Sequence, residues 1–319
     1  MKKTVLLLET IDEKALDILK ADTETDIIEA YSEDFDESQL DQHPVHGILT
    51  RGKGQVNEAL ISRLPQLEVV GRCGVGLDNV NVPFATSKKI KVVNAPGVNS
   101  QTIAEHTLSL MLILQRNLYH SIAQVKAGDW EKRANFKGDE IFGKTLGILG
   151  LGNIGQKVAK LAEAFGMEVI YWNDKKMEVP YPFKSLEEVL TEADIVSMHL
   201  PLVESTKNLI NEKSLALMKK SSLLINTARG GIIDQEALAS ALKNGVIAGY
   251  AADVLAVEPP EKTEPLLGLE NALITAHVGS LTDRTYTKMC VDVVNNVLAI
   301  LKKGSPDENS IFNRNELNP

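Results

Sequence analysis

Four charged side chains in the second half of the chain have the chemistry of an acid–base site that binds a carboxylate. Arg229 lies in the segment LLINTARGG, Asp253 and Glu258 lie in ADVLAVEPP, and His277 lies in TAHVGS. Each follows a short apolar run that is typical of a buried parallel strand. Ligands of an open α/β sheet bind outside the carboxyl ends of its strands. We therefore expect these residues to converge, although they are far apart in sequence.

Together these four residue types describe one kind of reaction. A guanidinium binds a carboxylate through two parallel hydrogen bonds. A histidine gives or takes a proton near neutral pH, and a neighbouring carboxylate orients its ring and stabilises its charged form. With a nicotinamide cofactor, the set fits hydride transfer between a carbinol and a ketone next to a carboxylate. Any one of these residues alone could be an ordinary loop residue, but four at the strand ends of one sheet favour a catalytic site.

A glycine-rich turn earlier in the chain predicts where the cofactor binds. In KTLGILGLGNIGQKVA, an apolar strand precedes the G-x-G-x-x-G pattern and an apolar helix follows it. Gly150 permits a tight turn, Gly152 lets the backbone approach a pyrophosphate, and Gly155 lets helix and strand pack closely. NAD-specific sites usually carry an acidic residue about 20 residues further on. That position holds Asn173, followed by Asp174.

The chain alternates between predicted strands and helices, which indicates parallel sheets with helices on both faces. The first series has strands at 5–8, 26–29, 47–49, 69–70 and 92–94, with helices at 13–21, 56–64 and 81–89. Ser100 is then expected to cap one long helix that runs to about Gly128. A second series has six strands, as a full dinucleotide-binding sheet does, at 145–149, 168–172, 195–198, 223–225, 248–251 and 272–274. A helix at 282–302 and a loosely ordered polar tail follow.

Composition limits the classes of function. The 319 residues are 44% hydrophobic, enough for a sizeable core in about two domains. A net charge of -9 argues against a nucleic-acid binder. No run approaches the roughly 18 apolar residues of a membrane span, and the apolar start is too short for a signal peptide. The two cysteines do not indicate a disulfide framework, and no cluster has the spacing of metal ligands. From these features together we expect a cytoplasmic protein without nucleic-acid or membrane partners.

Two arginines of the first series are candidates to bind a phosphate group on the substrate. Arg51, in TRGKG, and Arg72, in GRCG, follow predicted strands in an acidic protein. Pairing of both arginines with local carboxylates is the alternative, and the sequence leaves it open. Backbone N–H groups of Gly74, Val75 and Gly76 could hold the substrate carboxylate opposite Arg229. Among the histidines, His106 in the long helix is expected to be structural.

Seven blocks in order resemble the D-isomer-specific 2-hydroxyacid dehydrogenases over essentially the whole chain. The blocks are GRCGVGLDNVNV, NAPGVNSQTIAEHTLSLML, GKTLGILGLGNIG, HLPLVESTKNLI, INTARGGIID, ADVLAVEPP and TAHVGS. Within this family the chain looks closest to short D-3-phosphoglycerate dehydrogenases that lack a C-terminal regulatory domain. A glyoxylate/hydroxypyruvate reductase is the main alternative, and an NAD-sensing corepressor of the same family is a third.

The resemblance implies a catalytic trio of Arg229, Glu258 and His277. It also implies a Rossmann-type NAD-binding domain, residues 99–286, inserted into a flavodoxin-like substrate-binding domain, residues 1–98 and 287–319, and a homodimer. NAD is the expected cofactor and NADP the less favoured one, because no arginine stands beside Asn173 and Asp174 could replace the missing acid. The expected cofactor contacts are Gly150, Gly152, Asn153, Ile154, Gly155, Asn173, Asp174, Thr206, Thr227, Ala228, Arg229, Asp253, His277, Gly279 and Ser280.

Overall fold

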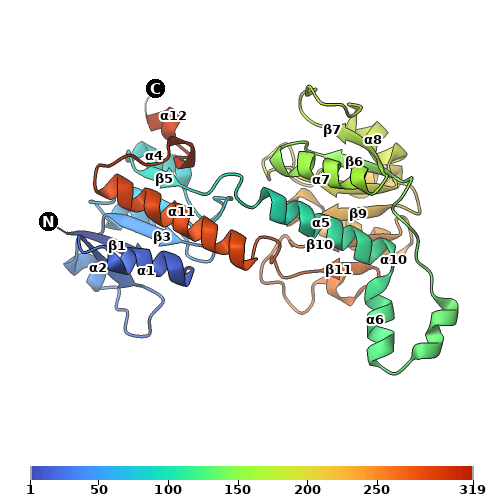
Figure 1. The fold of residues 1–319 in the computed structure, drawn as a ribbon, viewed down its shortest axis with the longest axis horizontal. Helices are drawn as coiled ribbons and strands as arrows, with labels where there is room; N and C mark the ends of the chain where they lie inside the picture. The colour runs from blue at the N-terminus through green and yellow to red at the C-terminus, as the bar shows by residue number, and fades with distance from the viewer. Residues whose placement is uncertain (1, 318–319) are drawn as a thin grey trace. The chain divides into compact units, whose positions relative to one another are not determined.

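The computed structural model describes residues 2–317, and the chain folds into two compact units. Unit 1 is formed by the described parts of segments 1–99 and 281–319, and unit 2 by residues 100–280. Each unit contains one sheet whose neighbouring strands all run parallel (Figure 1). Among the described residues, no helix is both long enough and apolar enough to cross a bilayer.

Unit 1 is a five-stranded sheet in the order β2-β1-β3-β4-β5. Alternate residues of its first strand in the chain, β1, face opposite sides, so Val5 and Leu7 enter one core and Leu6 enters the other. The first core is covered by α1 and α11, which pack on each other (Figure 1). The elements are β1 (Lys3–Leu7), α1 (Glu13–Ala21), β2 (Thr25–Glu29), α2 (Gln39–Gln42), β3 (Gly47–Thr50), α3 (Glu58–Arg63), β4 (Val69–Arg72), α4 (Val82–Ser87), β5 (Lys91–Val93) and α11 (Asp283–Leu301).

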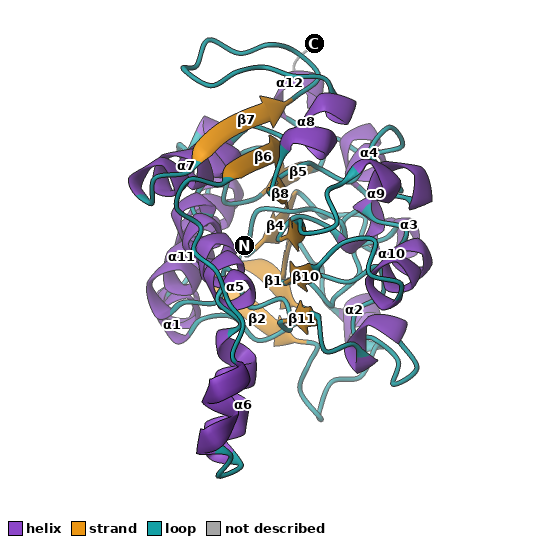
Figure 2. Cartoon of the chain, turned by 90° about the vertical axis from the view of Figure 1, so that its right-hand side faces the viewer, coloured by secondary structure: helices purple, strands orange, loops and turns teal. Residues whose placement is uncertain are grey.

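Unit 2 is a six-stranded sheet in the order β11-β10-β9-β8-β6-β7. Ile148 faces a core beneath α5 and α7, whereas Leu149 faces the core beneath α8, α9 and α10 (Figure 2). The elements are α5 (Ser100–Gln115), α6 (Leu118–Lys126), β6 (Thr145–Leu149), α7 (Asn153–Ala164), β7 (Glu168–Trp172), α8 (Leu186–Glu192), β8 (Ile195–Met198), α9 (Glu212–Leu217), β9 (Leu223–Asn226), α10 (Gln235–Lys243), β10 (Gly249–Ala252) and β11 (Ala272–Ile274).

Both sheets reverse their strand order at the same point. Numbered within each unit, both begin with the order 2-1-3-4-5, and unit 2 adds a sixth strand at its edge. The reversal lies between β1 and β3 in unit 1 and between β6 and β8 in unit 2. Ligands of doubly wound sheets bind at the carboxyl ends of the strands at such a reversal. The predicted class of two doubly wound parallel sheets is confirmed.

The single long helix predicted from residue 100 to about residue 128 was wrong. The chain forms α5 and α6 instead, and Asn117 between them has a left-handed backbone with φ of +50°. Asparagine tolerates this conformation better than most residues, so the apolar pattern continues past a break in the backbone. Ser100 is the first residue of α5 rather than a cap before it.

The prediction of a loosely ordered tail was also wrong for the described residues. Asn313 is 1% exposed, and its side-chain oxygen accepts from the Val92 N–H at 2.9 Å. The same side chain donates to the Ile90 carbonyl at 2.9 Å and to Thr86 Oγ1 at 2.8 Å. One asparagine thus satisfies three polar groups of unit 1, and Ile311 beside it joins the apolar core. The polar composition of the tail suggested disorder. Composition does not show which groups the asparagines bond, and here those bonds order the tail.

Candidate active site

The glycine-rich turn has the shape of a phosphate cradle. Gly150 ends β6 with φ of +95°, and a Cβ there would stand 2.6 Å from the His199 carbonyl oxygen. A Cβ on Gly155 would stand 2.3 Å from the Gly150 oxygen, so α7 packs closely on the turn. A Cβ on Gly152 would meet nothing within 4 Å, and this residue caps α7 without a side-chain bond. Open space therefore faces the helix N-terminus, where the first N–H groups and the helix dipole favour a phosphate.

The end of β7 lies beside this turn. The Gly150 N–H donates to the Trp172 carbonyl at 3.0 Å, which brings the following Asn173 next to the cradle. Asn173 is half-buried, whereas Asp174 and Lys175 are exposed. Asn173 is thus the residue nearest to the position of a ribose-binding acid. An amide can bond a ribose hydroxyl but carries no charge that repels a 2′-phosphate.

His277 and Glu258 form the central pair of the site. Nδ1 of His277 lies 2.6 Å from Glu258 Oε2, and Glu258 Oε1 accepts from the Leu255 N–H at 2.9 Å. Glu258 lies in the loop after β10, and His277 lies in the loop after β11, at the carboxyl ends of two adjacent strands. This geometry fixes one ring nitrogen on the carboxylate, so the opposite nitrogen, Nε2, is the one available to a substrate.

Both partners of this pair have shifted pKa values. The hydrogen bond that His277 donates to Glu258, helped by the charges of Glu258 and Asp253, raises the pKa of His277 above its ordinary value, although burial and the charge of Arg229 act to lower it. Burial alone would raise the pKa of Glu258, but its bonds from His277 and from the Leu255 N–H outweigh burial and lower it. The two shifts have opposite signs and both favour the charged form, as expected for an imidazolium–carboxylate pair.

Arg229 follows β9 and is brought toward this pair by the glycine that comes after it. A Cβ on Gly230 would stand 2.0 Å from the Leu255 carbonyl carbon and 2.2 Å from the Ala256 nitrogen. Only glycine lets the two loops approach so closely. Arg229 is half-buried, and its Nη1 donates to the Ala228 carbonyl at 2.7 Å. The arginine side chain is thus held at the strand ends beside the loop that carries Glu258.

Several residues predicted to contact the cofactor have side chains that hydrogen-bond other groups of the protein. Thr206 Oγ1 donates to the Pro201 carbonyl at 2.6 Å, and Thr227 Oγ1 lies 2.8 Å from Thr107 Oγ1. Asp253, 2% exposed, accepts from the N–H groups of residues 278 and 279 at 2.9 and 2.7 Å. These side chains shape the loops around the turn, and their contact with a cofactor stays a prediction.

In unit 1, Arg51 and Arg72 both stand at the carboxyl ends of strands, as predicted. Arg51 Nη1 bonds the Tyr286 hydroxyl of α11 at 3.2 Å, and its guanidinium lies 5.6 Å from the centre of that ring. A Cβ on Gly74 would stand 1.5 Å from Arg72 Nη1, so the Arg72 guanidinium lies against this glycine. The Gly74 N–H donates to the Arg72 carbonyl at 2.7 Å. The N–H groups of Val75 and Gly76 are therefore better placed than that of Gly74 to bind a carboxylate.

Sequence reasoning missed the residue that holds the Arg51 loop. Glu9 Oε1, at the end of β1, accepts from the N–H groups of Arg51, Gly52 and Gly54 at 3.0, 2.7 and 2.8 Å. Although burial acts to raise it, these backbone bonds lower the pKa of Glu9 to about 2. Its place directly after a buried strand, like that of the four residues first considered, was the signal that could have found it.

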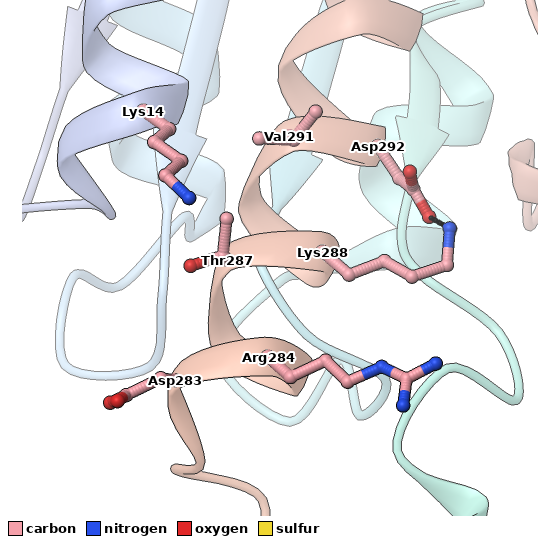
Figure 3. A pocket seen from close by; sticks show the side chains of 7 residues that line it. All are labelled: Lys14, Asp283, Arg284, Thr287, Lys288, Val291 and Asp292. Atoms are coloured by element: carbon pink, nitrogen blue, oxygen red, sulfur yellow. Dashed lines mark hydrogen bonds and ion pairs between the residues drawn. The ribbon is translucent and has the colours of Figure 1, made fainter.

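A hollow of about 480 Å³ between α1 and α11 is separate from all of these residues. Its walls carry both signs of charge, and Lys288 and Asp292 on α11 form an ion pair at 2.8 Å (Figure 3). The lining residues are Lys14, Asp283, Arg284, Thr287, Lys288, Val291 and Asp292. None of the predicted site residues lines this hollow. Within residues 2–317, no group of three or more histidine, cysteine or acidic side chains could hold a metal ion.

Comparison with known proteins gives consistent matches. Residues 108–279 match the family model described as D-isomer specific 2-hydroxyacid dehydrogenase, NAD binding domain. The chain is 37% identical over 295 residues to a hydroxypyruvate reductase of Thermotoga maritima, covering 91% of this chain and 95% of that protein. It is 37% identical over 305 residues to a D-3-phosphoglycerate dehydrogenase of Methanocaldococcus jannaschii, covering 93% of this chain but only 57% of that longer protein.

A solved structure matches both units. It is an NADPH-dependent glyoxylate/hydroxypyruvate reductase of Sinorhizobium meliloti in complex with NADP and malonate. The TM-score is 0.86 at 30% identity, and the match covers 98% of each chain. The match to the family model, over residues 108–279, includes the glycine-rich turn and the loops that carry Arg229, Glu258 and His277.

Proposed function

The chain belongs to the D-isomer-specific 2-hydroxyacid dehydrogenases, and on that premise we propose that it transfers hydride between NAD and D-3-phosphoglycerate/3-phosphohydroxypyruvate. The observation that carries the reaction type is the His277–Glu258 pair at 2.6 Å, in the same unit as the phosphate cradle. A proton donor held on a carboxylate and an open helix N-terminus are what a nicotinamide-dependent carbonyl reduction requires. In this proposal unit 2 binds the cofactor and unit 1 carries the substrate cations.

The residues divide the work of the reaction. The bound nicotinamide supplies or accepts the hydride. Arg229 binds the substrate carboxylate and fixes the carbonyl relative to His277. In reduction, the His277 imidazolium protonates the carbonyl oxygen, and in oxidation the neutral ring takes the hydroxyl proton. Glu258 keeps the ring oriented and stabilises its charged form.

The first prediction concerns the proton donor. His277→Ala should lower kcat by about 10²- to 10⁴-fold, because it removes general acid–base catalysis, and should leave NADH binding intact.

Because the pKa of His277 is raised, the wild-type rate of reduction should be highest at low pH and fall only above pH 6.5. The rate of oxidation should rise through the same range. Glu258→Gln removes the carboxylate, so both transitions should move to lower pH. Steady-state rates against pH test this, and near-wild-type turnover by His277→Ala would remove the assignment.

The substrate has two candidates within the family. Arg51 and Arg72 at strand ends support a phosphorylated substrate, and the Arg51 side chain bonds a phenol rather than a carboxylate. The second candidate is hydroxypyruvate or glyoxylate without a phosphate. It is favoured by the match to the Thermotoga protein over 95% of its length, whereas the chain spans little more than half of the matching D-3-phosphoglycerate dehydrogenase.

The second prediction separates these candidates. Arg51→Gln and Arg72→Gln should each lower kcat/KM for 3-phosphohydroxypyruvate by about 10- to 100-fold, since a charged hydrogen bond contributes about 1.5–3 kcal/mol, and should affect glyoxylate far less. Arg63→Gln is the matched control, because Arg63 pairs with Glu37 and Asp41 on the surface of unit 1. Equal losses on both substrates would exclude a phosphate pocket and leave the unphosphorylated 2-oxoacids.

For the cofactor, we propose NAD with weak discrimination against NADP. The half-buried Asn173 beside the cradle lacks the charge that repels a 2′-phosphate, while Asp174 follows it directly. The Sinorhizobium relative is named as NADPH-dependent. Both features support a preference that is less strict than an acid at position 173 would give.

The third prediction tests this preference. Asn173→Asp should reduce kcat/KM with NADPH on the order of tenfold, the equivalent of about 1.4 kcal/mol, with little change for NADH. Asp174→Asn is the companion variant, and it should weaken the preference for NADH if this carboxylate bonds the ribose. A wild-type enzyme that turns over faster with NADPH than with NADH would overturn the proposal and point to Lys175 and Lys176.

We also propose a homodimer that is joined through unit 2. The helix α6 stands off from the sheet (Figure 2), and none of its residues is buried within the chain. Its side chains Ile122 and Val125 are 55% and 49% exposed, and Trp130 just beyond it is 59% exposed. Large exposed apolar side chains gathered in one segment support an interaction site there, and a second copy is the partner that is always present.

The fourth prediction tests the dimer. Sedimentation equilibrium of the wild type should give about twice the 34.9 kDa mass of the chain. Val125→Glu places a charge in the proposed interface and should shift the protein toward the monomer. Val246→Glu, at another exposed valine of unit 2, should not. A wild type that sediments as a monomer would contradict the proposal.

A further inference from the structure

His106 is the one histidine of α5, and it faces the loop that carries His277. Its Nε2 lies 3.1 Å from Thr275 Oγ1 and 3.4 Å from Asp253 Oδ1. Thr275 Oγ1 also lies 2.5 Å from Asp253 Oδ1, and the hydroxyl is the donor in that bond. The hydroxyl oxygen is then left to accept, so Nε2 of His106 is the nitrogen that carries the proton. The sequence alone predicted only a structural residue here.

Asp253 connects His106 to the backbone on the far side of His277. Its two oxygens accept from the N–H groups of Val278 at 2.9 Å and of Gly279 at 2.7 Å. Burial alone would raise the pKa of Asp253, but bonds from His106, from Thr275 and from these N–H groups lower it, so the carboxylate stays ionised. The loop is thus held at Thr275 before the catalytic histidine and at two backbone groups after it.

Packing adds to these bonds. A Cβ on Gly279 would stand 3.2 Å from Cδ2 of His106, 3.1 Å from Cδ1 of Ile103 and 2.8 Å from Oδ2 of Asp253. The loop therefore lies directly against α5, with no room for a larger residue at position 279. Side chains of α5 and the buried Asp253 carboxylate thus pack against one side of the turn that contains His277.

The backbone of His277 explains why such support is needed. Its φ is +53°, a left-handed conformation that is unfavourable for a residue other than glycine. A residue persists in this conformation only when its surroundings hold it there. Released from its anchors, the loop would relax, and the ring would move away from Glu258.

We propose that His106 is a positioning residue that holds the 275–279 loop, through Thr275 and Asp253, in the conformation that keeps His277 on Glu258. This inference rests on the proposed function, because it assigns His106 to the reaction that His277 carries out. His106 itself does not touch the substrate or the cofactor in this account. The groups that act on His277 are Glu258 and Asp253, which favour its charged form, and Arg229, which opposes it.

The test compares three variants with the wild type. His106→Leu removes the donor, Thr275→Val removes the hydroxyl that it bonds, and His106→Gln restores a side-chain N–H donor of similar reach. We expect His106→Leu and Thr275→Val to lower kcat by about 10- to 100-fold, the effect of misplacing a catalytic group by roughly 1 Å, with NADH binding kept. The basic limb of the reduction rate should move to lower pH in both, because His277 loses its fixed contact with Glu258. His106→Gln should recover most of kcat and the wild-type limb.

Hydrogen exchange gives a readout that does not depend on activity. The amide hydrogens of Val278 and Gly279 should exchange faster in His106→Leu than in the wild type, whereas those of the buried strand β6 should keep their protection and report an intact fold. His43→Leu, at an exposed histidine of unit 1, is the control and should change neither rate nor exchange. If no 2-oxoacid is reduced by the wild type, the proposed function fails, and exchange at residues 278 and 279 still decides the positioning role. The positioning role of His106 would be overturned if, in His106→Leu, the amides of residues 278 and 279 exchanged at the wild-type rate and the basic limb of the reduction rate stayed at the wild-type pH.

Discussion

The proposed chemistry of this protein depends on one interaction, the hydrogen bond between Nδ1 of His277 and the carboxylate of Glu258. It joins the loops after β10 and β11, fixes which ring nitrogen can meet a substrate, and sets the direction of both pKa shifts. A histidine at a strand end without this partner would titrate near its ordinary value and rotate freely. With the partner, the ring has a defined orientation and a raised pKa, which favours its protonated form.

In unit 2, the loop that carries Arg229 lies against the loop that carries Glu258, which in turn bonds His277. Parallel strands all end at one edge of a sheet, so residues far apart in sequence become neighbours there. Because Gly230 has no side chain, the Arg229 loop can lie directly against the Leu255–Ala256 peptide. At the other side of the strand reversal, Gly150 and Gly155 let α7 begin close to β6, and Gly152 leaves its N-terminus open. Glycines thus determine how closely the backbone segments approach, and the charged residues supply the chemistry.

Much of this was predictable from the sequence, because apolar runs and strand-end residues follow from local chemistry. Four of the six strands of unit 2 have the predicted bounds. The residue types predicted a carboxylate beside the histidine, and the family resemblance implied that it is Glu258, which the structure pairs with His277. The predictions that were wrong depended on a backbone angle or on partners far away in the sequence. Asn117 breaks a continuous apolar pattern through its backbone angle alone, and Asn313 orders a polar tail by bonding three groups more than 200 residues away. His106 and Glu9 were not identified as site residues for the same reason, since their roles come from loops that only the fold brings to them.

The most direct test of the proposed hydride transfer is the reaction itself. Purified protein is mixed with NADH and, in separate reactions, with 3-phosphohydroxypyruvate, hydroxypyruvate and glyoxylate, and NADH absorbance and the configuration of the chiral products are measured. We expect NADH to be consumed with at least one of these 2-oxoacids, and any chiral product to be the D-hydroxyacid. No consumption of NADH or NADPH with any 2-oxoacid, or formation of the L-hydroxyacid, would contradict it.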